Sequence, residues 1–451
     1  MSTRLSVLET ERCVECQSCM FACSRRQNVA GLTKSCVRVR SIGGLERGFT
    51  IIVCRACFDP PCARACPSDA LSLREGGGVI LDMKKCIGCG HCLDACLIGA
   101  IQWDDTAEKP MICIHCGYCV EFPSKNLQQA THDGTANISG ENFAEHYLKR
   151  RLACSHCPVG CIHIAALREP YEDEPYFYKT SMISYDYEPI YALGSMLGMK
   201  TPADFLKLMD RVEAWGLDAM TTGVVLAWAT EALERKILSE KETLGVKLAW
   251  GDPAGYIQAC ELIIEQPNDF YQALARGVEY ASSRYGGQDF ALALGKNEMP
   301  GYNTGPGAHL GVLMGLRHSH LDNAGYSVDQ NQLVKEKIGP EKLAEILLAE
   351  ERWRQILSSL VICFFARGIY VPELVTELLE IAGFPLAKDD LERIGREIYQ
   401  DKYRFKLREG FSLDKLRLPA RILDAPSPIK GWDEAYLRSA LEHVKKILQA
   451  D

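Results

Sequence analysis

Cysteine is the residue type whose number and spacing point most directly to chemistry in this sequence. There are 21 cysteines among 451 residues, and sixteen of them precede residue 120. These sixteen include four groups of thiols separated by two to four residues: Cys13, Cys16, Cys19 and Cys23; Cys54, Cys57, Cys62 and Cys66; Cys86, Cys89, Cys92 and Cys96; and Cys113, Cys116 and Cys119. Such spacing aims successive thiolates at neighbouring irons of one [4Fe–4S] cluster, and the remaining iron takes a ligand from another repeat.

Disulfides and zinc are the alternative uses of so many cysteines. No secretory signal follows Met1, and 47% of the chain is hydrophobic, so a core can form without cross-links. Zinc sites typically combine two C-x2-C pairs, whereas triplets followed by x3-Cys favour iron–sulfur clusters. The sequence therefore predicts an iron–sulfur protein of an oxygen-poor cytoplasm.

A further triplet, Cys154, Cys157 and Cys161, has no fourth cysteine nearby. Only Cys260 and Cys363 follow it. Cys260 lies within the apolar stretch YIQACELII, which favours a buried and inert thiol.

The segments that must position these cysteines predict two different parts. Short strands are expected at 68–73 and 98–103, and glycines in CIGCGHC let the backbone wrap closely. Beyond a polar, turn-rich stretch, apolar residues recur at three- and four-residue steps, which predicts helices. These helices are expected at 224–238, 256–264, 342–360 and 372–383. We expect a ferredoxin-like domain over 1–125, a linker over 126–145 and helical domains over 146–451.

Charge and hydropathy exclude two classes of partner. The net charge of −8 argues against nucleic acid, because phosphate binding needs a basic face. No run of about 18 apolar residues is long enough to span a bilayer.

The first part resembles the four-cluster ferredoxin-like subunits that connect pterin-enzyme catalytic chains to electron partners. The resemblance covers about 115 residues and rests on the order and spacing of the cysteines. It implies that the second and third groups pair, and that the fourth group pairs with the end of the first. The implied ligand sets are Cys54, Cys57, Cys62 and Cys96; Cys86, Cys89, Cys92 and Cys66; and Cys113, Cys116, Cys119 and Cys23.

The set that begins with Cys13, Cys16 and Cys19 departs from this pattern. Pro123 stands where its fourth cysteine is expected, and Cys36 is the one cysteine of this half left over. We predict Cys36 as the fourth ligand, with a three-iron cluster or a non-cysteine ligand as alternatives.

The second part resembles the aldehyde ferredoxin oxidoreductase family of tungsten- or molybdenum-pterin enzymes. The matching segments, in order, are ENF (141–143), CSHCPVGC (154–161), YEPIYALGSMLG (187–198), WGLDAMTTG (215–223), GLRHSHLDNAGYS (315–327), IGREI (394–398), RFKLREGF (404–411) and LPAR (418–421). The implied fold is an α+β ferredoxin-like polyferredoxin module followed by a mostly α-helical domain pair of aldehyde ferredoxin oxidoreductase type.

This resemblance also implies site residues. Cys154, Cys157, Cys161 and Cys363 would bind a fifth [4Fe–4S] cluster, and the first pterin loop comprises Glu213, Gly216, Leu217 and Asp218. Glu188 and His320, with His318 as the alternative histidine, match the catalytic groups beside the metal and suit proton transfer. The structural alternatives are a solvated or helix-capping acid for Glu188 and a hydrogen-bonded structural histidine for His320.

Two departures from the family shape the functional hypothesis. The β-rich domain that cradles the bis-pterin is replaced by the ferredoxin module, and Ser358 and Val361 replace the Asp and Gly of the second pterin loop. Valine is poorly suited to the left-handed backbone that glycine permits. We expect a separate β-domain subunit to share a tungsten or molybdenum bis-pterin with this chain, and a ferredoxin or other redox subunit to exchange electrons. The alternatives are an electron-transfer and docking subunit with a relic pterin-enzyme domain, and a polyferredoxin without enzymatic role.

Overall fold

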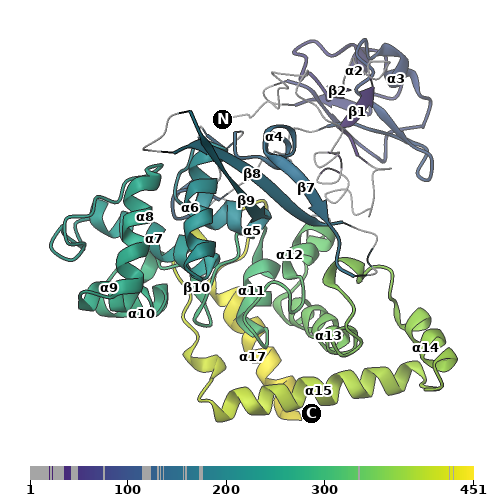
Figure 1. Ribbon diagram of the computed structural model, residues 1–451. Coiled ribbons are helices and arrows are strands. Elements are labelled where there is room, and N and C mark those ends of the chain that lie inside the picture. The colour runs from purple at the N-terminus through teal and green to yellow at the C-terminus, as the bar shows by residue number, and fades with distance from the viewer. Residues whose placement is uncertain are drawn as a thin grey trace. The chain divides into compact units, whose positions relative to one another are not determined.

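Two compact units make up the chain in a computed structural model (Figure 1). The first contains Met1–Phe122, Thr131–Ile190 and Met199–Asp210, and the second Pro123–Ala130, Tyr191–Gly198 and Arg211–Asp451. The structure describes residues 20, 23, 35–41, 49–74, 77–113, 123–129, 132, 134–135, 137–155, 157, 160–171, 176–333, 336–425, 427–429 and 431–450.

The cysteine-rich part of the first unit consists of short antiparallel hairpins and short helices. β1 (Arg38–Ser41) pairs with β2 (Phe49–Ile52), β3 (Leu71–Leu73) with β4 (Val79–Leu81), and β5 (Gln102–Asp104) with β6 (Lys109–Met111). Helices α2 (Pro61–Arg64) and α3 (His91–Ala95) each contain one buried cysteine. The predicted strands at 68–73 and 98–103 overlap β3 and β5. Thiols form part of the core, because Cys62 and Cys92 are packed with Leu71, Val79 and Ile101.

A three-stranded antiparallel sheet completes the first unit. Its order is β7 (Leu148–Leu152), β8 (Ile162–Pro170) and β9 (Tyr178–Tyr185), and α4 (Gly140–His146) contacts β7. Phe143 on α4 is fully buried, with its ring 4.8 Å from that of Tyr185 and 5.5 Å from that of Phe205. The connection from β7 to β8 carries the cysteine triplet.

The second unit is built from helices. Their bounds, with α5 and α6 that precede them, are α5 (Tyr187–Pro189), α6 (Pro202–Ala214), α7 (Ala219–Glu234), α8 (Pro253–Glu265), α9 (Asp269–Leu274), α10 (Val278–Tyr285), α11 (Pro306–Met314), α12 (Gly325–Val328), α13 (Pro340–Ser359), α14 (Pro372–Ile381), α15 (Lys388–Arg408), α16 (Arg421–Asp424) and α17 (Glu434–Ala450). Short helical turns add η2 (Ile190–Ser195), η3 (Gln288–Phe290), η4 (Asp329–Leu333), η5 (Phe364–Ala366) and η6 (Leu413–Lys415), and β10 (Ala293–Leu294) pairs with β11 (Asn297–Glu298).

The helices expected from periodicity are confirmed as α7, α8, α13 and α14. α7 is buried from Thr222 to Ala232, which explains why its sequence is apolar on all sides. α13 packs against both α15 and α17. The predicted fold class, an α+β ferredoxin-like module followed by helical domains, is therefore confirmed. Within the described residues, no helix is both long and apolar enough to cross a membrane.

A buried turn at residues 124–129 opens the second unit. Lys125, Asn126 and Leu127 have φ values of +47°, +53° and +58°, and Ser124 bridges to Gln129. The Asn126 amide donates to Glu231 at 2.7 Å and to the Phe290 carbonyl at 3.0 Å. The expected linker thus begins inside this turn and ends within α4.

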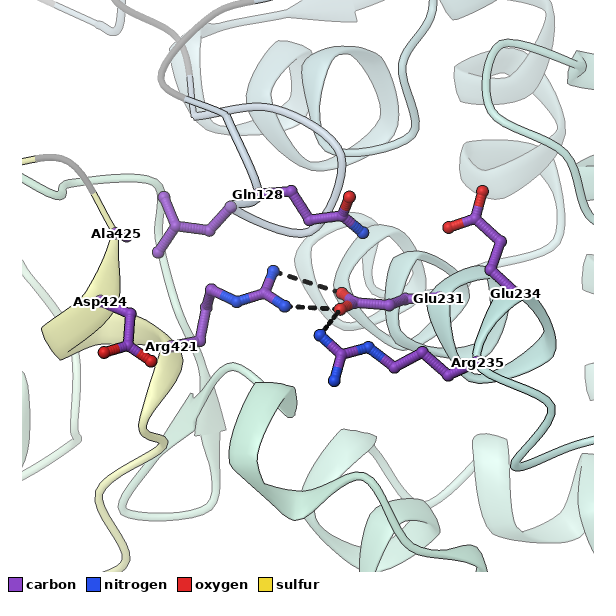
Figure 2. Close-up of a pocket in the computed structure, with 8 residues that line it drawn as sticks. Gln128, Glu231, Glu234, Arg235, Arg421, Asp424 and Ala425 are labelled. Atoms are coloured by element: carbon purple, nitrogen blue, oxygen red, sulfur yellow. Dashed lines mark hydrogen bonds and ion pairs between the residues drawn. The ribbon is translucent and has the colours of Figure 1, made fainter.

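Charged side chains surround this turn. Glu231 on α7, almost fully buried, forms ion pairs with Arg421 on α16 and, at 2.7 Å, with Arg235. Arg421 also donates to the Asn126 carbonyl at 2.7 Å. Figure 2 shows both guanidinium groups directed at the Glu231 carboxylate, in a pocket also lined by Gln128. The Glu231 carboxylate is paired with both guanidinium groups, and we infer that this ion-pair cluster stabilises the turn.

Candidate metal centres and catalytic residues

One cavity is lined by four thiols from two cysteine groups. Cys86, Cys89 and Cys92 belong to the loop and start of α3, and Cys66 follows α2. The loop depends on Gly88, with φ of +72°, since a Cβ there would lie 2.7 Å from the Glu108 carbonyl oxygen. Soft thiolate donors in an apolar enclosure fit a [4Fe–4S] cluster.

The set of Cys54, Cys57, Cys62 and Cys96 also lies together. Burial raises the pKa of the Cys54 thiol, and neighbouring Cys57 and Cys96 raise it further. Burial likewise raises the pKa of Cys62, with added effects from Cys54 and Cys96. Thiolates this close cannot share a buried site unless a cation compensates their charge, so the arrangement fits bound iron.

The last cysteine of the second group and the last cysteine of the third group each accept a hydrogen bond from a backbone N–H four residues later in the chain. The backbone N–H of Ala70 donates to Cys66 Sγ and that of Ala100 to Cys96 Sγ, both at 3.3 Å. Hydrogen bonds to ligand sulfurs stabilise the thiolate and tune cluster potentials.

The first and fourth cysteine groups are described only in part. Cys13, Cys16, Cys19, Cys116 and Cys119 lie outside the described residues. Cys36 is 2% exposed and packs with Cys113 and Cys23. Its backbone N–H donates to Cys23 Sγ at 3.2 Å. The structure thus groups Cys36 with Cys23 and Cys113.

The predicted fifth set is divided between the two units. Cys154, Cys157 and Cys161 belong to the first unit, where the Cys157 N–H donates to the Cys154 carbonyl at 2.9 Å and closes a turn. Cys363 belongs to the second unit and is exposed directly before η5. Their joint ligation stays a prediction.

The second pterin loop retains a left-handed residue in spite of its changed sequence. Val361 has φ of +58° and is 91% exposed. Valine therefore occupies the conformation that we expected it to disfavour. A β-branched residue in this region carries strain of about 1–3 kcal/mol.

The first pterin loop joins α6 to α7 and is largely exposed. Gly216 has φ of +69°, and its N–H donates to the Glu213 carbonyl at 3.1 Å. Asp218 caps α7, because its carboxylate accepts from the Thr221 N–H at 2.6 Å. Leu217 lies between them and is half-buried. The loop is accessible to a cofactor, and binding there is a proposal.

Glu188 is half-buried in α5 of the first unit. The acid that caps this short helix is its neighbour Asp186, which accepts from the Tyr187 N–H at 2.8 Å. The N-cap of α5 is thus Asp186, and both the catalytic role of Glu188 and its structural alternative stay predictions.

His320 lines a narrow cavity in the second unit, together with Tyr302, Tyr326 and His309. Its ring lies 5.0 Å from that of Tyr302, and Tyr302 stacks on Tyr326 at 4.2 Å. His318, the alternative histidine, is buried with Nδ1 2.9 Å from the Val312 carbonyl. Burial lowers the pKa of His318 to about 4, so that ring is neutral near pH 7.

Sequence reasoning missed the aromatic and histidine neighbours of this cavity. Tyr326 lies inside the segment that carries the family resemblance, but Tyr302 and His309 lie before it. Burial lowers the pKa of His309 to about 4, and its Nε2 lies 3.0 Å from Asn303 Oδ1. No spacing pattern in the sequence links Tyr302 or His309 to His320, so their meeting at one cavity could not be predicted.

The loop that carries His320 is held in place by hydrogen bonds to Asp322, a residue of the same loop. Asp322 is buried and accepts from the backbone N–H groups of Arg317 at 2.9 Å and Ser319 at 3.1 Å. Its other oxygen pairs with the Arg317 side chain at 2.7 Å.

Two helices hold the same loop from outside. Glu351 on α13 accepts from the Leu316 N–H at 2.8 Å and from Asn323 at 3.0 Å. Lys406 on α15 donates to the Gly315 carbonyl at 2.8 Å. Burial, then neighbouring Asp322, raises the pKa of Glu351 to about 8, and burial lowers the pKa of Lys406 to about 8.

Comparison with known proteins identifies both parts of the chain. Residues 106–449 match the family model for aldehyde ferredoxin oxidoreductase, domains 2 & 3, and residues 45–132 match a 4Fe-4S dicluster domain. The chain belongs to the aldehyde ferredoxin oxidoreductase family. The predicted resemblance is confirmed for both parts, as is the assignment to an oxidoreductase family with iron–sulfur clusters.

Two curated relatives match different parts of the chain. A tungsten-containing aldehyde ferredoxin oxidoreductase of Pyrococcus abyssi is 25% identical over 328 residues, 68% of this chain and 51% of the relative. The formate dehydrogenase iron-sulfur subunit of Wolinella succinogenes is 40% identical over 121 residues, 25% of this chain and 59% of the relative. The chain thus spans about half the length of the aldehyde ferredoxin oxidoreductases it matches.

A solved structure shares the fold. It is the active site complex BamBC of benzoyl coenzyme A reductase in complex with 1,5 dienoyl-CoA. The TM-score is 0.52 at 16% identity, covering 73% of this chain and 55% of that chain. At this identity the likeness concerns the fold alone.

Proposed function

We propose that this chain is an electron-transfer subunit of a tungsten- or molybdenum-pterin oxidoreductase, and that it contributes the helical half of the active site. A separate subunit supplies the β domain that binds the pterin. The observation that carries this proposal is the presence of family domains 2 and 3, with the His320 cavity, directly after a module in which four thiols line one cavity.

Five [4Fe–4S] clusters form the proposed electron path. Four are bound by the sets Cys54, Cys57, Cys62 and Cys96; Cys86, Cys89, Cys92 and Cys66; Cys113, Cys116, Cys119 and Cys23; and Cys154, Cys157, Cys161 and Cys363. The fifth begins with Cys13, Cys16 and Cys19, with Cys36 as the proposed fourth ligand. A cytoplasmic ferredoxin or another redox subunit exchanges electrons with this path in either direction.

The residues of this chain prepare the site for an aldehyde or related substrate. The bound pterin metal supplies the two-electron chemistry. His320 holds or releases a proton at the cavity, while the stacked rings of Tyr302 and Tyr326 form an apolar wall that excludes water. Glu188 is the second proposed proton-transfer group. Glu213, Gly216, Leu217 and Asp218 present an exposed, left-handed turn for the pterin.

A second candidate function is electron transfer and docking without catalysis. The strained, exposed Val361 and the Ser358 replacement favour it, because this loop no longer offers the family's aspartate and glycine. The helical domain would then be a relic of a pterin enzyme.

Metal analysis of native complexes distinguishes the two functions. The chain is purified anaerobically with its partners, and iron, tungsten, molybdenum and pterin are measured in each complex. We expect about twenty irons per chain in all complexes, and pterin metal only when a β-domain subunit is bound. Iron alone in every complex would leave the docking function.

A further inference from the structure

Glu298 is a buried acid of the second unit that the proposed mechanism does not use. It belongs to β11, and only 7% of the residue is exposed. One carboxylate oxygen accepts from the backbone N–H of Val278 at 2.9 Å, and the other accepts from the Thr221 hydroxyl at 3.0 Å. Burial raises the pKa of the Glu298 carboxyl, and both hydrogen bonds oppose that rise. A buried carboxylate needs such donors, because an unsatisfied acceptor leaves its desolvation uncompensated.

Both donors to Glu298 lie at the start of a helix. Val278 is the first residue of α10, and Thr221 lies in the first turn of α7. A Cβ at Gly277, which has φ of +89°, would lie 2.7 Å from a Glu298 oxygen, so glycine allows α10 to begin against this carboxylate. Glu298 therefore connects β11 with the N-terminal ends of two helices.

Thr221 also contacts the residue that ends the first pterin loop. Its backbone N–H donates to the Asp218 carboxylate at 2.6 Å, while its hydroxyl donates to Glu298. Asp218 is near enough to Glu298 to raise the pKa of that buried acid as well. One threonine thus joins an exposed acid of the loop to a buried acid of β11.

The other hydrogen bonds of this loop are local. The Leu217 N–H donates to the Val212 carbonyl at 3.0 Å, and the Gly216 N–H donates to the Glu213 carbonyl at 3.1 Å. The bond from Thr221 instead reaches a residue 77 positions later in the chain. It fixes the end of the loop relative to the core of the second unit.

We propose that Glu298 is a positioning residue for the pterin: it holds the Thr221 hydroxyl, and through it fixes the start of α7 and the direction in which Asp218 faces the cofactor. The inference rests on the proposed function. Glu298 is buried, so it acts through Thr221 rather than by contact with the cofactor. A loop that is already ordered loses less conformational entropy on binding, and therefore retains its ligand longer.

The test uses the native complex, purified anaerobically with variants of this chain. Pterin is released, oxidised and counted by fluorescence during prolonged dialysis. Thr221→Val removes the hydroxyl but keeps the backbone N–H that binds Asp218. We expect pterin to leave about tenfold faster, the ratio that corresponds to one hydrogen bond to a charged group. Hydrogen exchange in residues 213–221 should also become faster in this variant.

Two conservative variants separate the hydrogen bond from other effects of substitution. Thr221→Ser keeps the hydroxyl. Glu298→Gln keeps an oxygen for the Val278 N–H and offers its amide to the Thr221 hydroxyl. Both should retain pterin as the unmodified complex does, and loss from Thr221→Ser equal to that from Thr221→Val would overturn the inference.

Thr230→Val is the matched control on the same helix. The Thr230 hydroxyl donates to the Leu226 carbonyl at 2.8 Å, further along α7 and away from the loop. This variant should lower Tm without faster loss of pterin. Equal pterin loss from Thr221→Val and Thr230→Val, or unchanged loss in Thr221→Val, would contradict the positioning role. Absence of pterin from the complex of the unmodified chain would instead refute the proposed function itself.

Discussion

Lys406 reaches from α15 to the backbone of Gly315, and its ammonium lies 2.8 Å from that carbonyl oxygen. A side chain from the C-terminal part of the chain thus fixes the start of the loop that carries His320. The same lysine lies near two buried carboxylates, Asp322 and Glu351, which raise its pKa against the larger effect of burial.

Replacing this lysine should loosen the loop. Lys406→Met leaves the Gly315 carbonyl without this donor and removes one cation from beside the two carboxylates, while Arg317 stays paired with Asp322. We expect the free energy of unfolding in urea to fall by about 1–3 kcal/mol. Lys415→Met, at an exposed lysine, is the matched control and should change stability little. Equal stability of the two variants would show that the Lys406 contact contributes nothing.

Glu351 makes stability depend on pH. Its pKa is raised from 4.5 to about 8 in the folded chain, so the folded state binds this proton more tightly than the unfolded state. Its contribution is present below pH 4.5 and is lost as the pH rises through 8. Glu351→Gln should therefore flatten the decline in unfolding free energy between pH 5 and 8.

The geometry allows this substitution. Glutamine keeps an oxygen for the Leu316 N–H. Asn323 Nδ2 donates to the other Glu351 oxygen, so the glutamine amide requires Asn323 to turn its Oδ1, which has no donor among the described residues, toward it. A steeper pH dependence in Glu351→Gln than in the unmodified chain would contradict the assignment.

The two histidines of the loop should behave differently. His320→Asn should lower kcat/KM of the assembled enzyme by about 10²–10⁴-fold, the usual effect of a lost acid–base group, with little change in Tm. His318→Asn should lower Tm, because His318 is buried and bonded to Val312. Loss of activity in His318→Asn and loss of Tm in His320→Asn would make His318 the acid–base residue and His320 the structural one.

Asp218 offers a way to separate helix capping from cofactor binding. Asp218→Ala should cost about 1 kcal/mol of stability, since the Thr221 N–H loses its acceptor. Asp218→Asn keeps a capping oxygen but removes the charge. We expect normal stability and reduced pterin content in the asparagine variant, measured on the purified complex. Full pterin retention would confine Asp218 to capping.

Cys36 is the proposed fourth ligand of the cluster that begins with Cys13, Cys16 and Cys19. An iron without a cysteine ligand is held less firmly, so mild oxidation of Cys36→Ala should produce a three-iron signal in electron paramagnetic resonance. The unmodified chain should give much less of this signal under the same conditions. An equal signal in both proteins would remove Cys36 from the ligand set.

Local spacing predicted the cluster module well, because the geometry of a cubane is encoded within a few residues. The loop of Cys86, Cys89 and Cys92 is an example, and periodicity revealed α7 and α13 in the same way. The neighbours of Cys36 were not predictable, since they depend on how the turn before β1 folds over Cys23. Tyr302 reaches His320 through tertiary packing alone. Val361 shows a further limit, because residue preference argued against a conformation that the surrounding chain imposes.

The turn at 124–129 determines where a fragment of the helical unit can begin. A helical fragment that starts at residue 146, the predicted domain border, would lack Asn126 and lose its contacts with Glu231 and Arg421. A helical fragment should start at or before Pro123. Because the iron–sulfur module and the helical domains are parts of one chain, every molecule contains the two in equal number.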